Sequence, residues 1–137
     1  MITNLTHTFL YVLDLERAIS FYTQKLNFEI HVDIMVNHDR WVTLKIPDQP
    51  KLEFLLVVVE ESIIFKTNQA KQMVQLIGDN VLSFGVFECK NLLATYEELK
   101  NKSVEFCIEP YKNPELDKYE AAFFDDSGNW FRLTEAT

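Results

Sequence analysis

The residues numbered 6–27 read THTFLYVLDLERAISFYTQKLN, and this stretch decides the fold. Its first seven residues form a β-branched and aromatic run, which is typical of a strand. Asp14 then offers a helix N-cap, and Asn27 tolerates the left-handed conformation at which many helices end. Between them, apolar residues repeat at helical spacing on one face: Leu15, Ala18, Ile19, Tyr22 and Leu26. The sequence therefore predicts a strand followed directly by an amphipathic helix.

Three more strands follow this helix along the chain. Apolar alternation between turn-forming residues places them at residues 28–34, 41–46 and 52–59. The turn before the last of these strands is rich in structure breakers, Pro47-Asp48-Gln49-Pro50. The first sixty residues therefore predict a unit of strand, helix and three strands.

The same order of elements returns in the second half of the chain. Asn91 is a second possible helix cap, and strands are predicted at residues 81–89, 104–108, 119–124 and 130–134, with residues 110–114 irregular. Matching the two halves aligns Asp14 with Asn91, His7 with Phe84, Trp41 with Tyr119 and Glu53 with Arg132. We therefore predict one α+β domain, residues 1–137, built from two tandem βαβββ modules. Module one covers 1–60, a connecting segment that is helical in part covers 61–80, and module two covers 81–137. The modules are expected to form a curved mixed sheet with helices on its outer face.

Composition and charge exclude several classes of function. The chain has 13 Lys and Arg against 21 Asp and Glu, a net charge of −8, so nucleic acid is not an expected partner. The longest uncharged apolar run, Phe54 to Val59, is far shorter than the roughly 20 residues that cross a bilayer, so a membrane partner is not expected. The opening residues do not resemble a signal peptide. Cys89 and Cys107 have no metal or redox spacing and are expected to be buried, reduced thiols. These features predict a cytoplasmic protein.

Strand alternation indicates which side chains share the concave face of the sheet. Val42, Leu44 and Ile46 form the apolar set of their strand, so Trp41 and Thr43 face the opposite way. Applied to both modules, this reasoning gives an aromatic-walled face with a few polar groups, the usual form of a small-molecule site. The predicted ligand-binding residues are His7, Trp41, Thr43, Glu53, Phe84, Tyr119, Trp130 and Arg132. No catalytic residue is assigned.

The run HTFLYVLDLERAISFY, residues 7–22, resembles the opening of the vicinal oxygen chelate superfamily, which includes glyoxalase I, bleomycin-resistance proteins and extradiol dioxygenases. The run 87–99 and the turn Asp125-Asp126-Ser127-Gly128-Asn129 are similar to later signatures of that family. The resemblance implies paired βαβββ modules in a U-shaped barrel and commonly a homodimer.

Metal-dependent members of that superfamily use four strand positions as ligands, two from each module. The resemblance places them at His7, Glu53, Phe84 and Arg132. An aromatic ring cannot coordinate a metal, and a fixed cation repels one. Two protein ligands rarely hold a catalytic metal firmly. No cofactor is therefore expected, and His7 and Glu53 are left as weak metal candidates. His31 and His38 lie on or beside the turn after the second strand, and nothing in the sequence places them in the cavity.

Three functions remain open at this point. The broken ligand set and the aromatic face favour a metal-free protein that binds a small organic molecule, like the antibiotic-sequestering branch of the family. The alternative is a glyoxalase-type lyase or isomerase, or a dioxygenase, that uses Zn, Ni, Fe or Mn. The third is an interaction module whose barrel is filled by side chains.

Each site residue also has a structural interpretation. His7 can be a hydrogen-bonded core histidine, Glu53 and Arg132 can form a salt bridge, and the aromatic residues can fill the core. An unpaired Arg132 would favour an anionic or carbonyl-bearing ligand.

Overall fold

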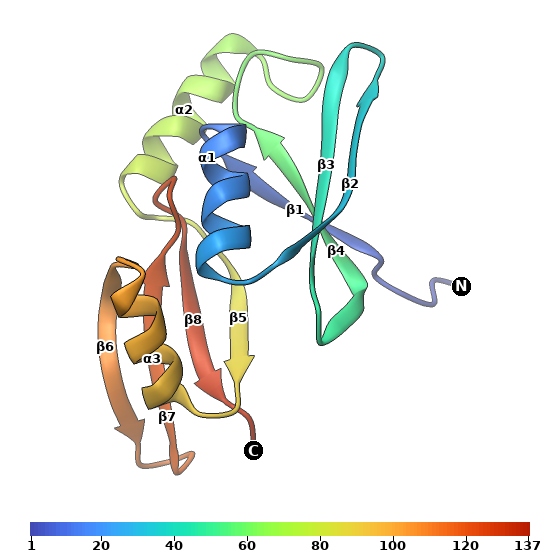
Figure 1. The fold of residues 1–137 in the computed structure, drawn as a ribbon. Coiled ribbons are helices and arrows are strands. Elements are labelled where there is room, and N and C mark those ends of the chain that lie inside the picture. Colours follow the sequence, from blue (N-terminus) through green and yellow to red (C-terminus); the bar gives the residue numbers. More distant parts are fainter. The chain divides into compact units, whose positions relative to one another are not determined.

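The computed structural model describes residues 1–137 and contains two compact units, Met1–Lys71 and Gln72–Thr137. Each unit holds one four-stranded mixed sheet with a helix across one of its faces (Figure 1). The helix α2, Thr67–Gly78, spans the boundary between the units. The predicted βαβββ repeat is therefore confirmed, and part of the predicted connecting segment is helical. No helix is long and apolar enough to cross a membrane.

The first module runs through six elements in the predicted order. They are β1 (His7–Val12), α1 (Leu15–Ser20), the π-helical turn η1 (Phe21–Lys25), β2 (Glu29–Val36), β3 (Asp39–Ile46) and β4 (Gln49–Val58). The strand order in the sheet is β1-β4-β3-β2, with β1 and β4 parallel and the other pairs antiparallel. The parallel pair joins the first and last strands, which brings the start and the end of the module together.

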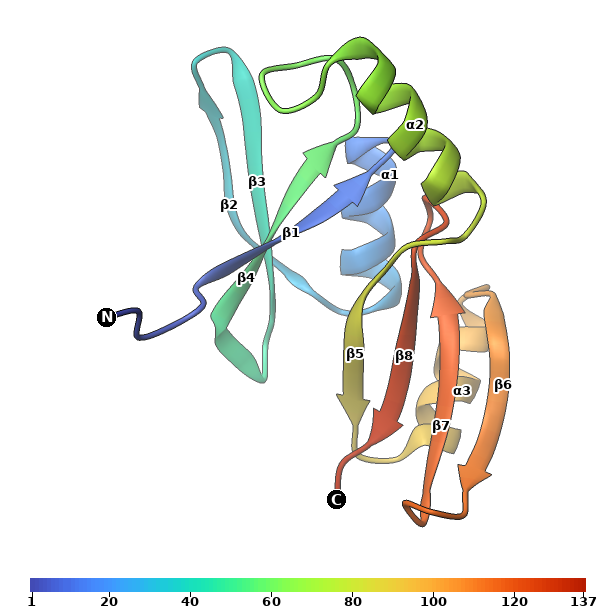
Figure 2. The same ribbon diagram turned by 180° about the vertical axis from the view of Figure 1, so that it is seen from behind.

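The second module repeats this topology. Its elements are β5 (Ser83–Cys89), α3 (Leu92–Asn101), β6 (Phe106–Asn113), β7 (Lys118–Phe124) and β8 (Trp130–Glu135), and the strand order is β5-β8-β7-β6. Again the first and last strands are parallel and the other pairs are antiparallel (Figure 2).

The helices α1 and α3 begin at the residues that the sequence indicates. The Asp14 carboxylate accepts a hydrogen bond from the Arg17 amide at 2.9 Å, and the Asn91 side chain accepts one from the Ala94 amide at 3.0 Å. Each cap satisfies an amide that would otherwise have no partner within the helix. Asn27 follows the first helix with φ at 60°, the left-handed conformation expected for it.

The helix-facing sides of the sheets hold the cores. In the first module the buried residues include Leu10, Val12, Val42 and Leu44, as alternation predicts. In the second, Phe87, Phe123 and Phe131 form a cluster with ring centroids 4.7 to 6.2 Å apart. Trp130, Arg132 and Thr134 alternate with Phe131 and Leu133, which are buried, so they lie on the face away from α3.

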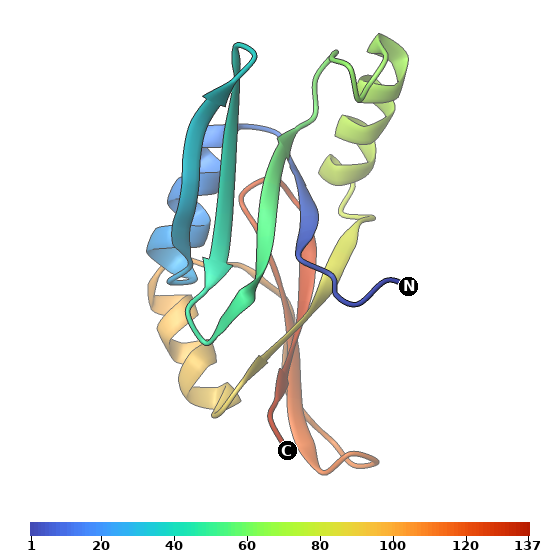
Figure 3. The same cartoon turned by 90° about the vertical axis from the view of Figure 1, so that its right-hand side faces the viewer.

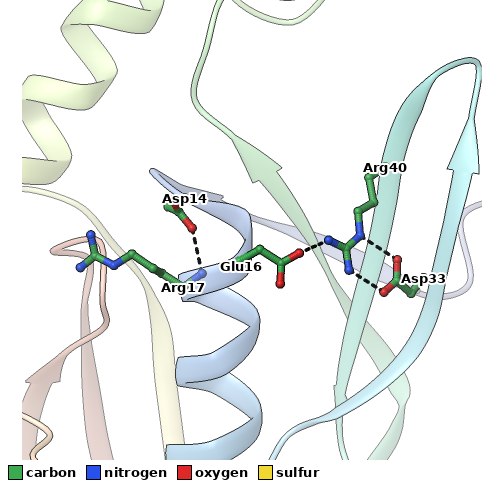
Figure 4. A network of polar contacts seen from close by, with 5 residues as sticks. All are labelled: Asp14, Glu16, Arg17, Asp33 and Arg40. Atoms are coloured by element: carbon green, nitrogen blue, oxygen red, sulfur yellow. Dashed lines mark hydrogen bonds and ion pairs between the residues drawn. The ribbon is translucent and has the colours of Figure 1, made fainter.

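An ion-pair network fixes α1 to the β2–β3 hairpin of the first module (Figure 4). The Arg40 guanidinium donates to both carboxylate oxygens of Asp33, at 2.9 and 2.8 Å, and also to Glu16 on α1. This bidentate geometry is the strong form of an arginine–carboxylate contact. All of these residues lie on the helix side of the sheet, away from the predicted site.

Two strands, β4 and β6, extend furthest beyond their predicted bounds, and both contain proline. β4 begins at Gln49 and so includes Pro50, at the start of a strand where a missing amide is tolerated. β6 continues through Pro110, where the pairing with β7 shifts register between Ile108 and Tyr111. A proline at a bulge breaks no regular ladder bond. The expectation that residues 110–114 are irregular is therefore wrong for most of that stretch.

Candidate functional site

The sheet face opposite α1, here called the first open face, brings together residues from three strands. His7, Phe9 and Tyr11 alternate with the buried Leu10 and Val12 of β1 and therefore project from this face. Thr43 and Trp41 of β3 share it, because they alternate with the buried Val42 and Leu44. On β4, Glu53 is the register partner of His7. Figure 3 shows the four strands of this sheet side by side, with α1 behind them.

Glu53 is the centre of a polar cluster on the first open face. Its Oε1 accepts hydrogen bonds from the Thr43 hydroxyl at 2.8 Å and from His31 Nδ1 at 2.5 Å. Its Oε2 lies 3.3 Å from His7 Nε2, and His7 Nδ1 lies 3.0 Å from the Thr6 hydroxyl. The Thr43 side chain is almost fully buried, while both imidazoles are exposed. Glu53 thus has side-chain partners at both oxygens.

These partners change the ionisation of Glu53. Partial burial by itself raises the pKa of the carboxyl, but the hydrogen bonds from His31 and Thr43 and the nearby His7 outweigh it. The net pKa lies below the ordinary value for glutamate. Glu53 is therefore a carboxylate at neutral pH, an acceptor held in place by its neighbours.

His31 belongs to this cluster, although the sequence does not indicate it. The register of β2 against β3 shifts between Ile30 and Val32, so His31 sits in a bulge. A bulge adds one residue to a strand and redirects its side chain, and alternation cannot predict where it occurs. The one sequence feature that points to His31 is that a histidine stands in a predicted strand.

Aromatic side chains border the polar cluster. The rings of Phe9 and Tyr11 meet edge to face with centroids 6.4 Å apart, and Tyr11 meets Phe65 in the same way at 5.8 Å. Trp41 is 41% exposed. The first open face therefore combines ring surfaces with hydrogen-bonding groups, the combination that holds and orients small organic molecules.

The face of the second sheet opposite α3, here called the second open face, has its own polar cluster. Arg132 Nη2 donates to Glu120 Oε2 at 3.1 Å and to the Tyr111 hydroxyl at 3.3 Å. The Tyr111 hydroxyl donates to the same Glu120 oxygen at 2.7 Å. Tyr111, and then Asn113 and Arg132, lower the pKa of the Glu120 carboxyl against the effect of burial, so it is ionised at neutral pH. Neither Tyr111 nor Glu120 was singled out by the sequence.

The predicted position of Tyr119 on this face is wrong. Glu120 pairs with Thr134 and Ala122 with Arg132, so it is the even-numbered residues of β7 that share the open face. Tyr119 is odd-numbered like Ala121 and Phe123, which are buried on the helix-facing side, so Tyr119 lies on that side too. The predicted repeat is one residue out of step at this strand, and Glu120 occupies the position expected for Tyr119.

The register also corrects how the two modules correspond. Val12 pairs with Val58 in the first module, and Cys89 pairs with Glu135 in the second, which is a constant offset of 77 at both strands. Backbone hydrogen bonds give the same offset for the last strands. The Glu53 amide donates to the Thr6 carbonyl, and the Trp130 amide donates to the Leu82 carbonyl. Glu53 therefore corresponds to Trp130, two residues before Arg132. Because the shift is two residues, Trp130 and Arg132 still share one face.

Two further expectations concern the position of Phe84 on the open face and a salt bridge between Glu53 and Arg132. The β5–β8 register is irregular between Ser83 and Val86, so alternation does not assign a face to Phe84, and Val86 is the residue opposite Arg132. Glu53 and Arg132 each have partners within their own module. A Glu53–Arg132 pair stays a prediction, as do the binding roles of the predicted ligand-binding residues other than Tyr119.

The side chains present do not fit the four-ligand metal site that the family resemblance implies. Of the four implied positions, Phe84 and Arg132 have no lone pair to offer a metal, and the Arg132 guanidinium is ion-paired with Glu120. No group of three or more His, Cys, Asp or Glu side chains is arranged to hold a metal ion.

The two cysteines are not disulfide-bonded. Cys89 is half-buried and Cys107 is exposed, so the expectation of a buried thiol is wrong for Cys107.

Comparison with known proteins shows a match along nearly the whole chain. The family model described as Glyoxalase/Bleomycin resistance protein/Dioxygenase superfamily matches residues 4–133. The chain is 33% identical over 129 residues to YurT of Bacillus subtilis (strain 168), covering 93% of this chain and 95% of that protein. It is 30% identical over 137 residues to YetH of the same organism, covering 98% and 100%.

Solved structures show the same fold. The crystal structure of UcmS2 has a TM-score of 0.93 and 38% identity, covering 99% of this chain and 100% of that one. TnmS3, described as an antibiotic binding protein from Streptomyces sp. CB03234, has a TM-score of 0.75 and 19% identity, covering 99% and 98%. A superfamily member from Sphaerobacter thermophilus DSM 20745 has a TM-score of 0.74 and 21% identity, covering 98% of each chain.

Proposed function

The chain belongs to the Glyoxalase/Bleomycin resistance protein/Dioxygenase superfamily, and from that premise we propose that it binds a small organic molecule without a tightly held metal. The observation that carries this proposal is the first open face. There, a carboxylate that is hydrogen-bonded by its own neighbours shares the sheet face with the exposed aromatic side chains of Phe9 and Trp41. Rings provide contact area for an apolar molecule, and a few fixed polar groups orient it.

The absence of a metal is part of the proposal and rests on the donor set. His7 and Glu53 supply two ligands where catalytic sites usually keep three, and no group of three or more His, Cys, Asp or Glu side chains is arranged to hold a metal ion. The family resemblance places Phe84 and Arg132 at the other two ligand positions, and neither a phenyl ring nor a guanidinium has a lone pair to offer a metal. A glyoxalase-type or dioxygenase reaction at a Zn, Ni, Fe or Mn centre is the alternative, and a metal measurement separates the two.

One structural neighbour supports the ligand class. TnmS3 is described as an antibiotic binding protein, and its likeness to this chain is one of fold. A shared scaffold does not determine the ligand, but TnmS3 is an example of this architecture in an antibiotic binding protein. We infer a ligand that is largely apolar and carries a few hydrogen-bonding groups, matching the composition of the open faces.

We also propose that the protein works as a cytoplasmic homodimer. Ile34 is 53% exposed on the same sheet as Trp41, and exposed apolar surface of this kind commonly marks an interface. Two unpaired cysteines suit a reducing compartment. Light scattering on the purified protein should give twice the chain mass of 16.1 kDa, whereas a mass of one chain would contradict the dimer.

The binding proposal is tested by a screen of small aromatic compounds, read as a shift in thermal unfolding. Compounds that stabilise the wild type are re-measured with Trp41→Ala and with Met35→Ala as the matched control. Met35 is also an exposed apolar residue, but it pairs with Arg40 on the helix side of the hairpin. We expect Trp41→Ala to weaken binding and Met35→Ala to leave it unchanged. Equal binding by both variants, or no stabilising compound, would contradict the proposal.

A further inference from the structure

The second open face carries an arginine whose hydrogen-bonding capacity is only partly used. We propose that Arg132 donates a hydrogen bond to an uncharged carbonyl oxygen of a small molecule bound at this face. This inference rests on the proposed function and names the chemical class of the ligand.

The geometry leaves donors of Arg132 available. Both of its contacts, to Glu120 and to Tyr111, use the same nitrogen, Nη2. The guanidinium has five N–H donors, so those on Nε and Nη1 can serve another acceptor. The side chain is 39% exposed. Arg40 gives the contrast within this chain, because its Nε, Nη1 and Nη2 all contact Asp33 or Glu16.

The charges around Arg132 favour an uncharged acceptor over an anion. Glu120 is a buried carboxylate at 3.1 Å from Nη2, so the pair has no net charge. The Tyr111 hydroxyl also directs its proton to Glu120, which holds the carboxylate in place. The chain as a whole carries −8, which repels anions at long range. A carbonyl oxygen accepts the same hydrogen bond without this repulsion. Glu120 and Tyr111 act as positioning residues for the guanidinium.

The surroundings of Arg132 are apolar and accessible. Its register partner on β5, Val86, is 60% exposed, and Ile108 on β6, opposite Ala122, is also exposed. Trp130 lies on the same face two residues earlier along β8. A ligand that suits this surface therefore has an apolar body with a carbonyl group at the position of Arg132.

The test uses three probes that share one benzene ring: acetophenone, which has an uncharged carbonyl, benzoate, which has an anion, and ethylbenzene, which has no oxygen. Each is titrated into ¹⁵N-labelled wild-type protein, and the Nε–H signals of the arginines and the backbone amides are followed by NMR. We expect acetophenone to bind most tightly and to shift the Arg132 Nε–H signal while the Arg40 signal stays in place. This wild-type measurement does not depend on any variant folding.

Two variants complete the test. Arg132→Gln should weaken acetophenone binding by about tenfold or more, the effect expected for losing a hydrogen bond to a charged donor, and should leave ethylbenzene unaffected. Arg40→Gln is the matched control and should change neither. Equal binding of acetophenone and ethylbenzene, with backbone shifts on the open faces, would overturn this inference and leave the proposed function standing. Tighter binding of benzoate would overturn the choice of an uncharged ligand. Backbone shifts with none of the three would contradict both proposals.

Discussion

Two buried threonine hydroxyls, one with a partner and one without, allow the role of Glu53 to be tested quantitatively. The Thr43 hydroxyl donates to Glu53 Oε1 at 2.8 Å, and the Thr43 side chain is 1% exposed. The Thr134 hydroxyl oxygen is buried with no hydrogen-bond partner. Valine has nearly the shape of threonine, so Thr43→Val and Thr134→Val each replace a hydroxyl by a methyl group and change little else.

The two substitutions should have opposite signs. A hydrogen bond to a charged group contributes about 1.5–3 kcal/mol. Because Oε1 keeps its bond from His31, Thr43→Val should lower the free energy of unfolding by about 1–2 kcal/mol near neutral pH. Thr134→Val removes a buried polar group that has no partner, and should raise that free energy by up to about 1 kcal/mol.

The effect of Thr43→Val should also depend on pH. The Thr43 hydroxyl favours the ionised form of Glu53 and so lowers its pKa in the folded protein. Such a contribution is present above the ordinary glutamate pKa of about 4.3 and is lost as the pH falls through the lowered folded-state value. Urea unfolding of both variants at several pH values measures this. Equal destabilisation by the two variants, or a Thr43→Val effect that is constant with pH, would refute the assignment.

Three further outcomes follow from the same contacts. His31→Gln should raise the pKa of the Glu53 carboxyl toward its ordinary value, seen by ¹³C NMR titration of that group, whereas His38→Gln in the β2–β3 turn should leave it unchanged. Tyr111→Phe removes the donor that does most to lower the pKa of Glu120, so its destabilisation should be present above a pH of about 4.3 and be lost as the pH falls through the lowered folded-state pKa, as measured by thermal unfolding. Leu44→Ala should lower the free energy of unfolding by about 2–5 kcal/mol, because Leu44 is fully buried against the helix side of the sheet; a loss below about 1 kcal/mol in urea unfolding would contradict that placement.

Local chemistry explains why the fold could be predicted from the sequence. Asp14 and Asn91 have side chains that bond to the first amides of a helix, and Asn27 adopts a positive φ at low cost. The alternation of Val42 and Leu44 with Trp41 and Thr43 fixes which way the strand faces. These signals act over a few residues and therefore appear directly in the sequence.

The candidate site was less predictable, because its residues depend on register. One extra residue at the β2 bulge brings His31 to Glu53, and the bulge around Pro110 sets which residues of β6 face β7. A one-residue error in the repeat moved the prediction from Glu120 to Tyr119 and so to the wrong face. Cross-strand pairing is decided by contacts between distant residues, which a single sequence does not display.

The most direct test of the proposed function is the metal content of the protein, purified without chelators and measured by elemental analysis. Zinc, nickel, iron and manganese are counted per chain before and after incubation with each ion. We predict less than about a tenth of a metal ion per chain under all of these conditions, because no three His, Cys, Asp or Glu side chains are arranged to hold a metal ion, and catalytic sites usually keep three protein ligands. Near-stoichiometric metal that is lost in His7→Ala and Glu53→Gln would contradict the account and favour an oxygen-chelating enzyme.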